Sequence, residues 1–459
     1  YDQRCFKSSA MDFDDLLLKT HYLLDNHPES LLKYQNKFQY ILIDEYQDTN
    51  HVQYLIIKKL AALNENICVV GDDAQSIYSF RGAKIENILN FKNDYPDYKS
   101  YKLEQNYRST STIVETANSL IDFNENQIKK TVWTDNEKGE KIILCKCNSD
   151  SDEGRLVANT IFEIKLREQV FPKDFAVLYR TNAQSRSIEE ALRKKNIPYK
   201  IYGGLSFYQR KEIKDILAYC RLTINPNDEE AFKRVINYPS RGIGNTTLQK
   251  IIATSNNSNV GIWNLINNLD DFEHNINKGT CKKINEFALL IKSYISQLNK
   301  YDAYFLAEHI AKSSGVFNDL YHDKSPEGVS RFENIQELLN GLKDFCENND
   351  ENLLSHYMRD VALLTNQDNE KKEDFNKVTL MTVHAAKGLE FPYVFVVGLE
   401  QNLFPSLLAS DNQESLEEER RLFYVAITRA KKRLFLSHTT NRFRWGNYIF
   451  CEPSQFLSE

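Results

Sequence analysis

Short runs of large apolar residues, each ending in glycine or polar residues, constrain the fold of this chain more than any other feature of its sequence. A first cluster covers residues 39–45 and 66–73. A second cluster covers five runs, at residues 141–147, 174–180, 377–383, 393–398 and 432–438. Such runs are typical of parallel strands that are covered on both faces, and the helical patterns between them fit βαβ units. We therefore predict an α/β fold.

A change of pattern divides the chain. Between residues 218 and 375, amphipathic helical patterns dominate, as in residues 333–347, and strand-like runs are almost absent. We predict a helical domain at 218–375, inserted into an α/β domain whose two halves are residues 106–217 and 376–459. Residues 1–105 form a separate α/β piece in this interpretation.

Composition excludes few classes of function. The apolar runs are far shorter than the roughly 18 residues that a membrane-spanning helix needs, so we expect a soluble, cytoplasmic protein with no membrane partner. The eight cysteines are scattered along 459 residues, which argues against a disulfide framework or a zinc site. The net charge of −6 counts mildly against a nucleic-acid binder, although it is compatible with a local basic groove.

Two adjacent carboxylates follow the first apolar run, in the segment ILIDEYQDTN (41–50). Asp44 and Glu45 would lie at the carboxyl edge of a sheet, where open α/β folds bind ligands. In a nucleotide triphosphatase, the first acid holds magnesium and the second can accept a proton from the attacking water. These two residues alone leave open a simpler alternative, a strand that ends in solvated acids.

A second polar loop follows the run at 66–73, within VVGDDAQSIYSFRGA (69–83). Gln75 is a candidate sensor of a phosphate or of water. Tyr78, Phe80 and Arg81 supply stacking faces and a positive charge, which suit single-stranded nucleic acid because bases stack on aromatic rings. Taken alone, the two aromatic residues are more typical of a protein core.

Six segments, in order, resemble the motifs of UvrD/Rep/PcrA-type superfamily 1 DNA helicases. They are DEYQDTN (44–50), VVGDDAQSIYSFRGA (69–83), LEQNYRS (103–109), YGGLSFYQRKEIKD (202–215), TVHAAKGLEFPYVFVVGLE (382–400) and EEERRLFYVAITRAKKRL (417–434). The resemblance covers nearly the whole chain. It implies RecA-like P-loop NTPase motor domains, the first incomplete, with the helical domain inserted in the second. It also implies a 3′→5′ DNA helicase or translocase of DNA repair and replication that uses ATP and Mg²⁺.

The resemblance assigns roles around the nucleotide residue by residue. Asp44 matches the magnesium-associated acid, Glu45 matches the catalytic base, and Gln75 matches the glutamine that links the γ-phosphate to the DNA path. Tyr107 resembles the aromatic residue that stacks on the adenine. Glu390 resembles the acid that contacts the nucleotide sugar.

Arg108 and Arg429 match two arginines that reach the γ-phosphate from the second motor domain. A guanidinium suits this role because it is planar and permanently charged. Without the resemblance, a surface ion pair would be the simpler interpretation of either arginine. His384 and Lys387, in HAAKGLEF, resemble residues that couple the nucleotide and DNA sites. Phe80 stands where many relatives carry Trp, so an aromatic face is retained.

Two further segments resemble DNA-contacting parts of the family. Gly242 and Gly244 belong to a Gly-Ile-Gly turn ahead of a helix, where backbone amides can bind phosphate; a plain turn is the alternative. Residues 439–450 predict a hairpin with Trp445 near its tip, which resembles the wedge that separates strands at a fork. The expected partners are single-stranded DNA, duplex/single-strand junctions and repair proteins.

No G-x-x-x-x-G-K-[ST] phosphate-binding loop occurs in the sequence. We therefore expect that this stretch of chain alone does not hydrolyse ATP at a useful rate, and that the first sheet has an exposed apolar edge. Two other classes stay open. One is a non-enzymatic DNA-binding or partner-binding protein on a helicase scaffold, and the other is the motor part of a helicase–nuclease.

Overall fold

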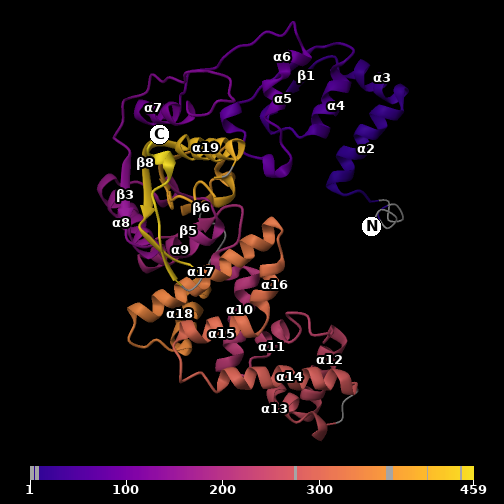
Figure 1. Cartoon of the computed structure of the whole chain (residues 1–459), viewed down its shortest axis with the longest axis vertical. Coiled ribbons are helices and arrows are strands. Elements are labelled where there is room, and N and C mark those ends of the chain that lie inside the picture. The colour runs from indigo at the N-terminus through magenta and orange to yellow at the C-terminus, as the bar shows by residue number, and fades with distance from the viewer. Residues whose placement is uncertain (1–4, 6–9, 273–275, 368–375, 411, 445–446) are drawn as a thin grey trace.

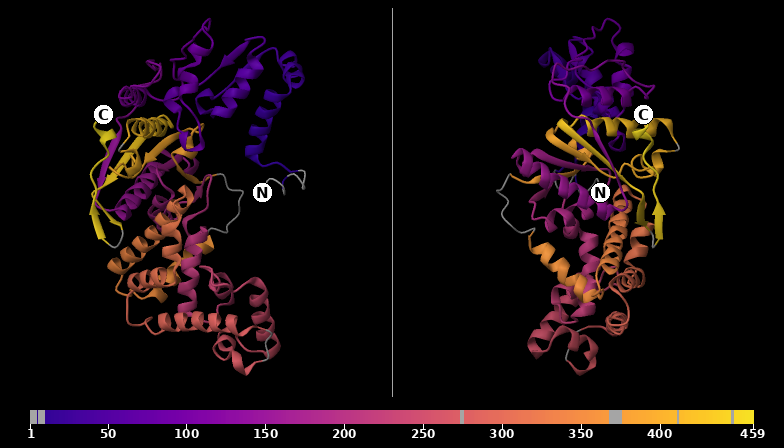
Figure 2. Two further views of the ribbon diagram at one scale, coloured as in Figure 1. Left: turned by 45° about the vertical axis from the view of Figure 1, so that its right-hand side comes forward. Right: turned by 90° about the vertical axis from the view of Figure 1, so that its left-hand side faces the viewer.

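The apolar runs form two parallel sheets that lie in different parts of the molecule (Figure 1). The computed structural model describes residue 5 and residues 10–272, 276–367, 376–410, 412–444 and 447–459. The small sheet lies near one end, the large sheet lies in the middle, and a helical region lies at the other end (Figure 1; Figure 2). Every helix in the described part of the chain is too short or too polar to cross a membrane.

The small sheet belongs to a first unit, which runs from α2 to α6 (residues 13–94). Its strand β1 (Ile41–Ile43) pairs in parallel with β2 (Ile67–Val69). The helices are α2 (Phe13–Asn26), α3 (Pro28–Lys37), α4 (His51–Ala61), α5 (Glu86–Leu89) and α6 (Phe91–Asp94). Helix α4 starts after Asn50, whose side chain forms a reciprocal capping box with Gln53. Leu42 is 77% exposed, so this sheet leaves apolar surface in contact with solvent.

The large sheet contains six strands, all paired in parallel, in the order β3-β8-β7-β4-β6-β5. The strands are β3 (Ile143–Cys147), β4 (Phe175–Tyr179), β5 (Tyr199–Ile201), β6 (Val378–Thr382), β7 (Phe391–Val396) and β8 (Ala430–Thr439). Each run of the second apolar cluster is a strand here, which confirms the α/β prediction. Strand β5 was not predicted, because it is three residues long and has Lys200 at its centre.

Helices cover both faces of the large sheet. Side chains alternate along each strand, so Ala176 and Leu178 of β4 face one core and Val177 faces the other. The first core is completed by α7 (Ser111–Ile121) and α19 (Gln413–Ile427), and the second by α8 (Asp150–Glu168) and α9 (Ser185–Lys194). We call this sheet and its helices, residues 111–201 and 378–450, the second unit.

The helical region (residues 211–367) lies between β5 and β6, and the residues described in that interval contain no strand. Its helices are α10 (Lys211–Ile224), α11 (Glu229–Val235), α12 (Asn245–Ser258), α13 (Ile262–Asn267), α14 (Lys278–Ile295), α15 (Ala303–Ser313), α16 (Val316–His322), α17 (Pro326–Asn348) and α18 (Leu354–Gln367). Their apolar faces share one core that extends from Phe207 to Val361. The expected boundary at residues 217 and 218 falls inside α10, and the domain limits stay predictions.

A hairpin follows β8, as predicted for residues 439–450. Its strands, β9 (Asn441–Arg444) and β10 (Asn447–Phe450), are antiparallel, with Tyr448 opposite Phe443. Trp445, the residue expected at the tip, lies outside the described residues. Its role as a wedge therefore stays a prediction.

A buried arginine joins the helical region to the second unit. Arg186, in α9, is 1% exposed, and Gly341 of α17 leaves room for it, because a Cβ at Gly341 would lie 2.8 Å from its Nη1. Four carboxylates surround the guanidinium: Asp150 at 3.1 Å, Glu190 at 3.2 Å, Glu337 at 2.7 Å and Asp344 at 3.4 Å. Glu337 and Asp344 lie on α17, so the cluster links both parts of the chain.

Candidate functional site

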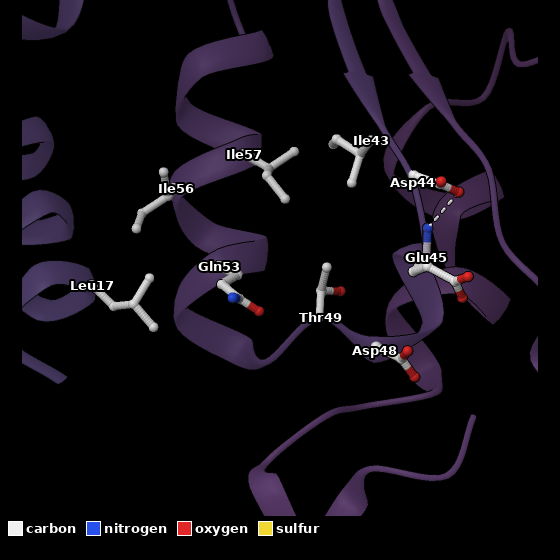
Figure 3. A pocket seen from close by; sticks show the side chains of 9 residues that line it. All are labelled: Leu17, Ile43, Asp44, Glu45, Asp48, Thr49, Gln53, Ile56 and Ile57. Atoms are coloured by element: carbon white, nitrogen blue, oxygen red, sulfur yellow. Dashed lines mark hydrogen bonds between the residues drawn. The ribbon is translucent and has the colours of Figure 1, made fainter. Parts of the chain in front are cut away.

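Two acids lie directly after β1, at the carboxyl end of the strand. Glu45 has a φ of 51°, in the left-handed region, and its N–H donates to Asp44 Oδ1 at 2.9 Å. The turn places both carboxylates beside a cavity of about 400 Å³. Its lining residues are Leu17, Ile43, Asp44, Glu45, Asp48, Thr49, Gln53, Ile56 and Ile57. In Figure 3 the acids lie on one side of this cavity, and Leu17, Ile56 and Ile57 lie on the other.

The acids at this cavity fit a magnesium–phosphate ligand. Asp44 and Glu45 are both exposed, so their oxygens are accessible. The described residues hold no group of three or more His, Cys, Asp or Glu side chains placed to bind a metal alone. Mg²⁺ in nucleotide sites usually takes only one or two carboxylates and completes its shell with phosphate oxygens and water. The donor set therefore suits Mg²⁺ bound together with a phosphate.

A chain of hydrogen bonds connects Glu45 to Gln75. Gln47 Nε2 donates to Glu45 Oε2 at 2.5 Å, and its Oε1 accepts from the N–H of Asp72 at 3.0 Å. Asp72 Oδ2 in turn accepts from Gln75 Nε2 at 2.7 Å. Because β1 and β2 are parallel neighbours, the loops after them meet at one edge of the sheet. The structure thus brings the predicted base and the predicted sensor into one network.

Lys387 joins this network from the second unit. Its Nζ donates to the carbonyl of Gln75 at 2.7 Å and to Asp48 Oδ2 at 2.5 Å, and it lies 3.5 Å from Glu45 Oε2. Burial raises the pKa of Asp48 above its usual range, although Lys387 acts in the opposite direction. The lysine therefore contacts the loops after both strands of the small sheet.

A second cavity, of about 470 Å³, brings together Tyr107, Arg108 and Glu390, three of the residues expected at the nucleotide. Its lining consists of Gln105, Asn106, Tyr107, Arg108, Glu390 and Lys431. Tyr107 is 79% exposed, so its ring is available for stacking. Glu390 accepts hydrogen bonds from Arg108 and Lys431, and these cations, Lys431 most strongly, lower its pKa to about 2. Glu390 is therefore ionised at neutral pH, beside two cations.

Arg429 does not line either cavity. It is 2% exposed, and its guanidinium donates to the carbonyls of Val425 at 3.0 Å and Leu389 at 3.1 Å. Burial, followed by the nearby charge of Arg108, lowers its pKa to about 10. In this state Arg429 is bonded to the backbone of its own unit, and its role at a phosphate stays a prediction.

The residues expected to contact DNA bases also gather in one place. The hydroxyl of Tyr78 donates to the carbonyl of His384 at 3.2 Å, and the ring of Phe80 meets the imidazole edge-on at 5.3 Å. The guanidinium of Arg81 lies 5.4 Å from both aromatic rings. Phe80 is 63% exposed. Burial, with the charges of Arg180 and Arg81, lowers the pKa of His384 to about 3, so the imidazole is neutral.

The Gly-Ile-Gly turn lies apart from these groups, in the helical region. Gly242 has a φ of 71°, which favours glycine, and Gly244 precedes the first residue of α12 with nothing near its Cβ position. Arg241 stabilises the turn, because its guanidinium donates to the carbonyls of Val235 and Tyr238 at 3.1 and 3.0 Å. The role of this turn at a DNA phosphate stays a prediction.

Several residues of the site are not singled out by any motif in the sequence. Gln47 and Asp72 bridge Glu45 and Gln75, and Lys431 lines the second cavity. Glu418 accepts from the N–H of Ser79 at 3.0 Å and so contacts the aromatic loop from α19. Proximity to the DEYQDTN, GDD and TRAKK segments was the available clue, but spacing alone does not distinguish these side chains from their neighbours.

Comparison with known proteins agrees with this geometry. The family model of the UvrD/REP helicase N-terminal domain matches residues 1–96, and that of the UvrD-like helicase C-terminal domain matches residues 101–441. The chain is similar to the ATP-dependent DNA helicase PcrA of Staphylococcus aureus (strain Mu50), at 42% identity over 463 residues, covering 100% of this chain and 63% of the relative. The PcrA helicase of Leuconostoc citreum is 41% identical over 465 residues, covering 100% and 62%. The chain therefore spans less than two thirds of the length of these relatives, and it belongs to the UvrD/PcrA-type helicase family.

Proposed function

We propose that this chain works as part of an ATP-dependent DNA helicase that moves 3′→5′ along single-stranded DNA. The observation that carries the proposal is the path of hydrogen bonds from Glu45 through Gln47 and Asp72 to Gln75, which Lys387 joins from the second unit. The path connects a base beside the cavity to the loop that carries Phe80. A motor needs such a connection, because a nucleotide changes the grip on DNA only through contacts that differ between its states.

The chemistry assigned to the cavity in Figure 3 is phosphoryl transfer to water. Mg²⁺ at Asp44 would neutralise charge on the phosphate oxygens. Glu45 accepts a proton from the attacking water, and Gln47 and Lys387 orient its carboxylate. Arg108 supplies positive charge from the second cavity. Arg429 supplies a second positive charge only after it exchanges its hydrogen bonds to the carbonyls of Val425 and Leu389 for hydrogen bonds to phosphate.

The proposed DNA path begins at Phe80. A base stacked on this ring gains about 1–3 kcal/mol, and Arg81 adds positive charge beside it. The glycine turn before α12 suits the phosphates of a duplex, because a helix N-terminus attracts anions without reading sequence. A protein that holds single-stranded DNA at Phe80 and duplex at Gly242–Gly244 would act on junctions between them, which arise in DNA repair and replication.

The test uses the longer protein that carries this chain. We expect ATP hydrolysis that is stimulated by single-stranded DNA, and unwinding of duplexes with a 3′ tail but not of those with a 5′ tail. Glu45→Gln should abolish hydrolysis and leave DNA binding intact, whereas Glu115→Gln, at an exposed position of α7, should change neither. DNA binding without hydrolysis in the unmodified longer protein would refute the motor and favour a non-enzymatic DNA-binding protein.

A separate measurement addresses the 459-residue chain by itself. It contains both acids, Gln75 and both arginines but no phosphate-binding loop, so we propose that it does not turn over ATP at a useful rate. The measurement is phosphate release with and without single-stranded DNA. Turnover that depends on DNA and is lost in Glu45→Gln would contradict this part of the proposal.

A further inference from the structure

Lys130 contacts the sensor loop from the second unit. It lies between α7 and β3, and its side chain is 20% exposed. Its Nζ lies 2.5 Å from Asp72 Oδ1 and 2.7 Å from Asp73 Oδ1. Both acids follow β2, so the contact crosses from the second unit to the first.

Asp72 is the branching point of the network around the base. Besides Lys130, it binds the side-chain amide of Gln75 through Oδ2 and the side chain of Gln47 through its N–H. Gln47 reaches Glu45. A shift of the Asp72 carboxylate therefore acts directly on the side chain of Gln75, and a shift of the whole residue also acts on Glu45 through Gln47.

The charge balance at this point depends on the lysine. Asp73 is 2% exposed and accepts from Lys130 and from the N–H of Ile128 at 2.9 Å. Burial tends to lower the pKa of Lys130, but Asp72 and Asp73 raise it above its ordinary value, so the ammonium stays charged. Without the Lys130 ammonium, the partly buried carboxylates of Asp72 and Asp73 would repel each other.

Two lysines of the second unit thus hold Gln75 from different sides. Lys387 donates to the backbone carbonyl of Gln75. Lys130 donates to the Asp72 carboxylate, which accepts a hydrogen bond from the Gln75 side chain. If the two units move relative to each other, both contacts change at once.

We propose that Lys130 is a positioning residue for ATP hydrolysis, which acts through Asp72 to hold Gln75 and Glu45 in their working arrangement. This inference rests on the proposed function. Lys130 does not line either cavity, so its effect should fall on the turnover rate and not on nucleotide affinity.

The experiment compares variants of the longer protein that carries this chain. Lys130→Met should lower the DNA-stimulated kcat about tenfold, which corresponds to about 1.4 kcal/mol, with KM for ATP and the Kd for single-stranded DNA changed less than about twofold. Lys130→Arg keeps the charge and should restore most of the rate. Lys129→Met changes an exposed neighbour and is the matched control.

A double variant separates positioning from general destabilisation. If Lys130 acts through Gln75, then Lys130→Met should cost little further rate in a Gln75→Ala background. An unchanged kcat in Lys130→Met, or equal losses in both backgrounds, would overturn the inference. Absence of DNA-stimulated hydrolysis in the unmodified protein would overturn the proposed function as well, so the two failures are distinguishable.

Discussion

Replacing Arg186 by Met should loosen the junction between the helical region and the second unit. The guanidinium is buried among Asp150, Glu190, Glu337 and Asp344. Methionine has a similar length and no charge, so it leaves four partly buried carboxylates without their cation. Breaking one side of a buried ion pair usually costs about 3–5 kcal/mol, because the remaining charge is uncompensated.

The effect should depend on pH, because the carboxylates can relieve their repulsion by taking up protons. We expect a larger loss at about pH 8 than at about pH 5.5. If the junction unfolds with a segment of about 150–250 residues, a loss of this size lowers Tm by roughly 6–20 °C. Thermal unfolding followed by circular dichroism measures the shift, and hydrogen exchange along α17 locates it.

Arg331→Met provides a control on the same helix. Arg331 pairs with Glu327 at 3.1 Å in the exposed first turns of α17, and such a surface pair contributes about 0–1 kcal/mol. Equal shifts for the two variants, or a loss in Arg186→Met that does not grow with pH, would refute the electrostatic account of this junction.

Three further outcomes follow from the site and its surroundings. Burial raises the pKa of Glu337 to about 7, so the folded state holds a proton that the unfolded state releases. The free energy of unfolding should therefore fall as pH rises from about 5 through 7. In Glu337→Gln, the denaturant concentration at the unfolding midpoint should depend less on pH over that range. Phe80→Ala should weaken binding of a labelled oligothymidine by about 1–3 kcal/mol in fluorescence anisotropy, whereas Phe80→Trp should retain it; equal affinity of both would exclude stacking at this ring. The pKa of His384 is lowered to about 3, so its imidazole NMR signals should not shift between about pH 5 and 8, and a midpoint near the ordinary value would contradict its burial.

The large sheet could be predicted from sequence because its strands are buried on both faces. Alternating contacts such as those of Val177 and Leu178 require apolar residues at successive positions, and this requirement appears directly as apolar runs. Strand β5 lacks such a run, since Lys200 is exposed at its centre. The sequence pattern also did not locate the start of the helical region, because α10 continues without a break through residue 217.

The site residues that directly follow a strand could be predicted from the sequence. The residues that reach the site only through tertiary contacts could not. Asp44 and Gln75 follow adjacent parallel strands, so their proximity is a consequence of the sheet. The contacts of Lys130 with Asp72 and of Lys431 with Glu390 join distant segments, and nothing in the local sequence marks one lysine among its neighbours. The burial of Arg429 depends on which backbone carbonyls lie within its reach, which a motif does not specify.

The strand order of the large sheet has a consequence for how the chain is made. Strand β3 is at one edge, and its partner among the described residues is β8, with Ile143 opposite Phe435. On a ribosome, β3 and the whole helical region emerge before residues 430–439 exist. Until then β3 has an unpaired edge on each side, the condition in which strands of different chains associate. The long loop between β3 and β8 adds little to the free-energy cost of pairing these strands, but it slows their encounter. Completion of this sheet therefore waits for the synthesis of β8, and a ribosome that stops before β8 releases a chain in which β3 and β7 have no strand between them.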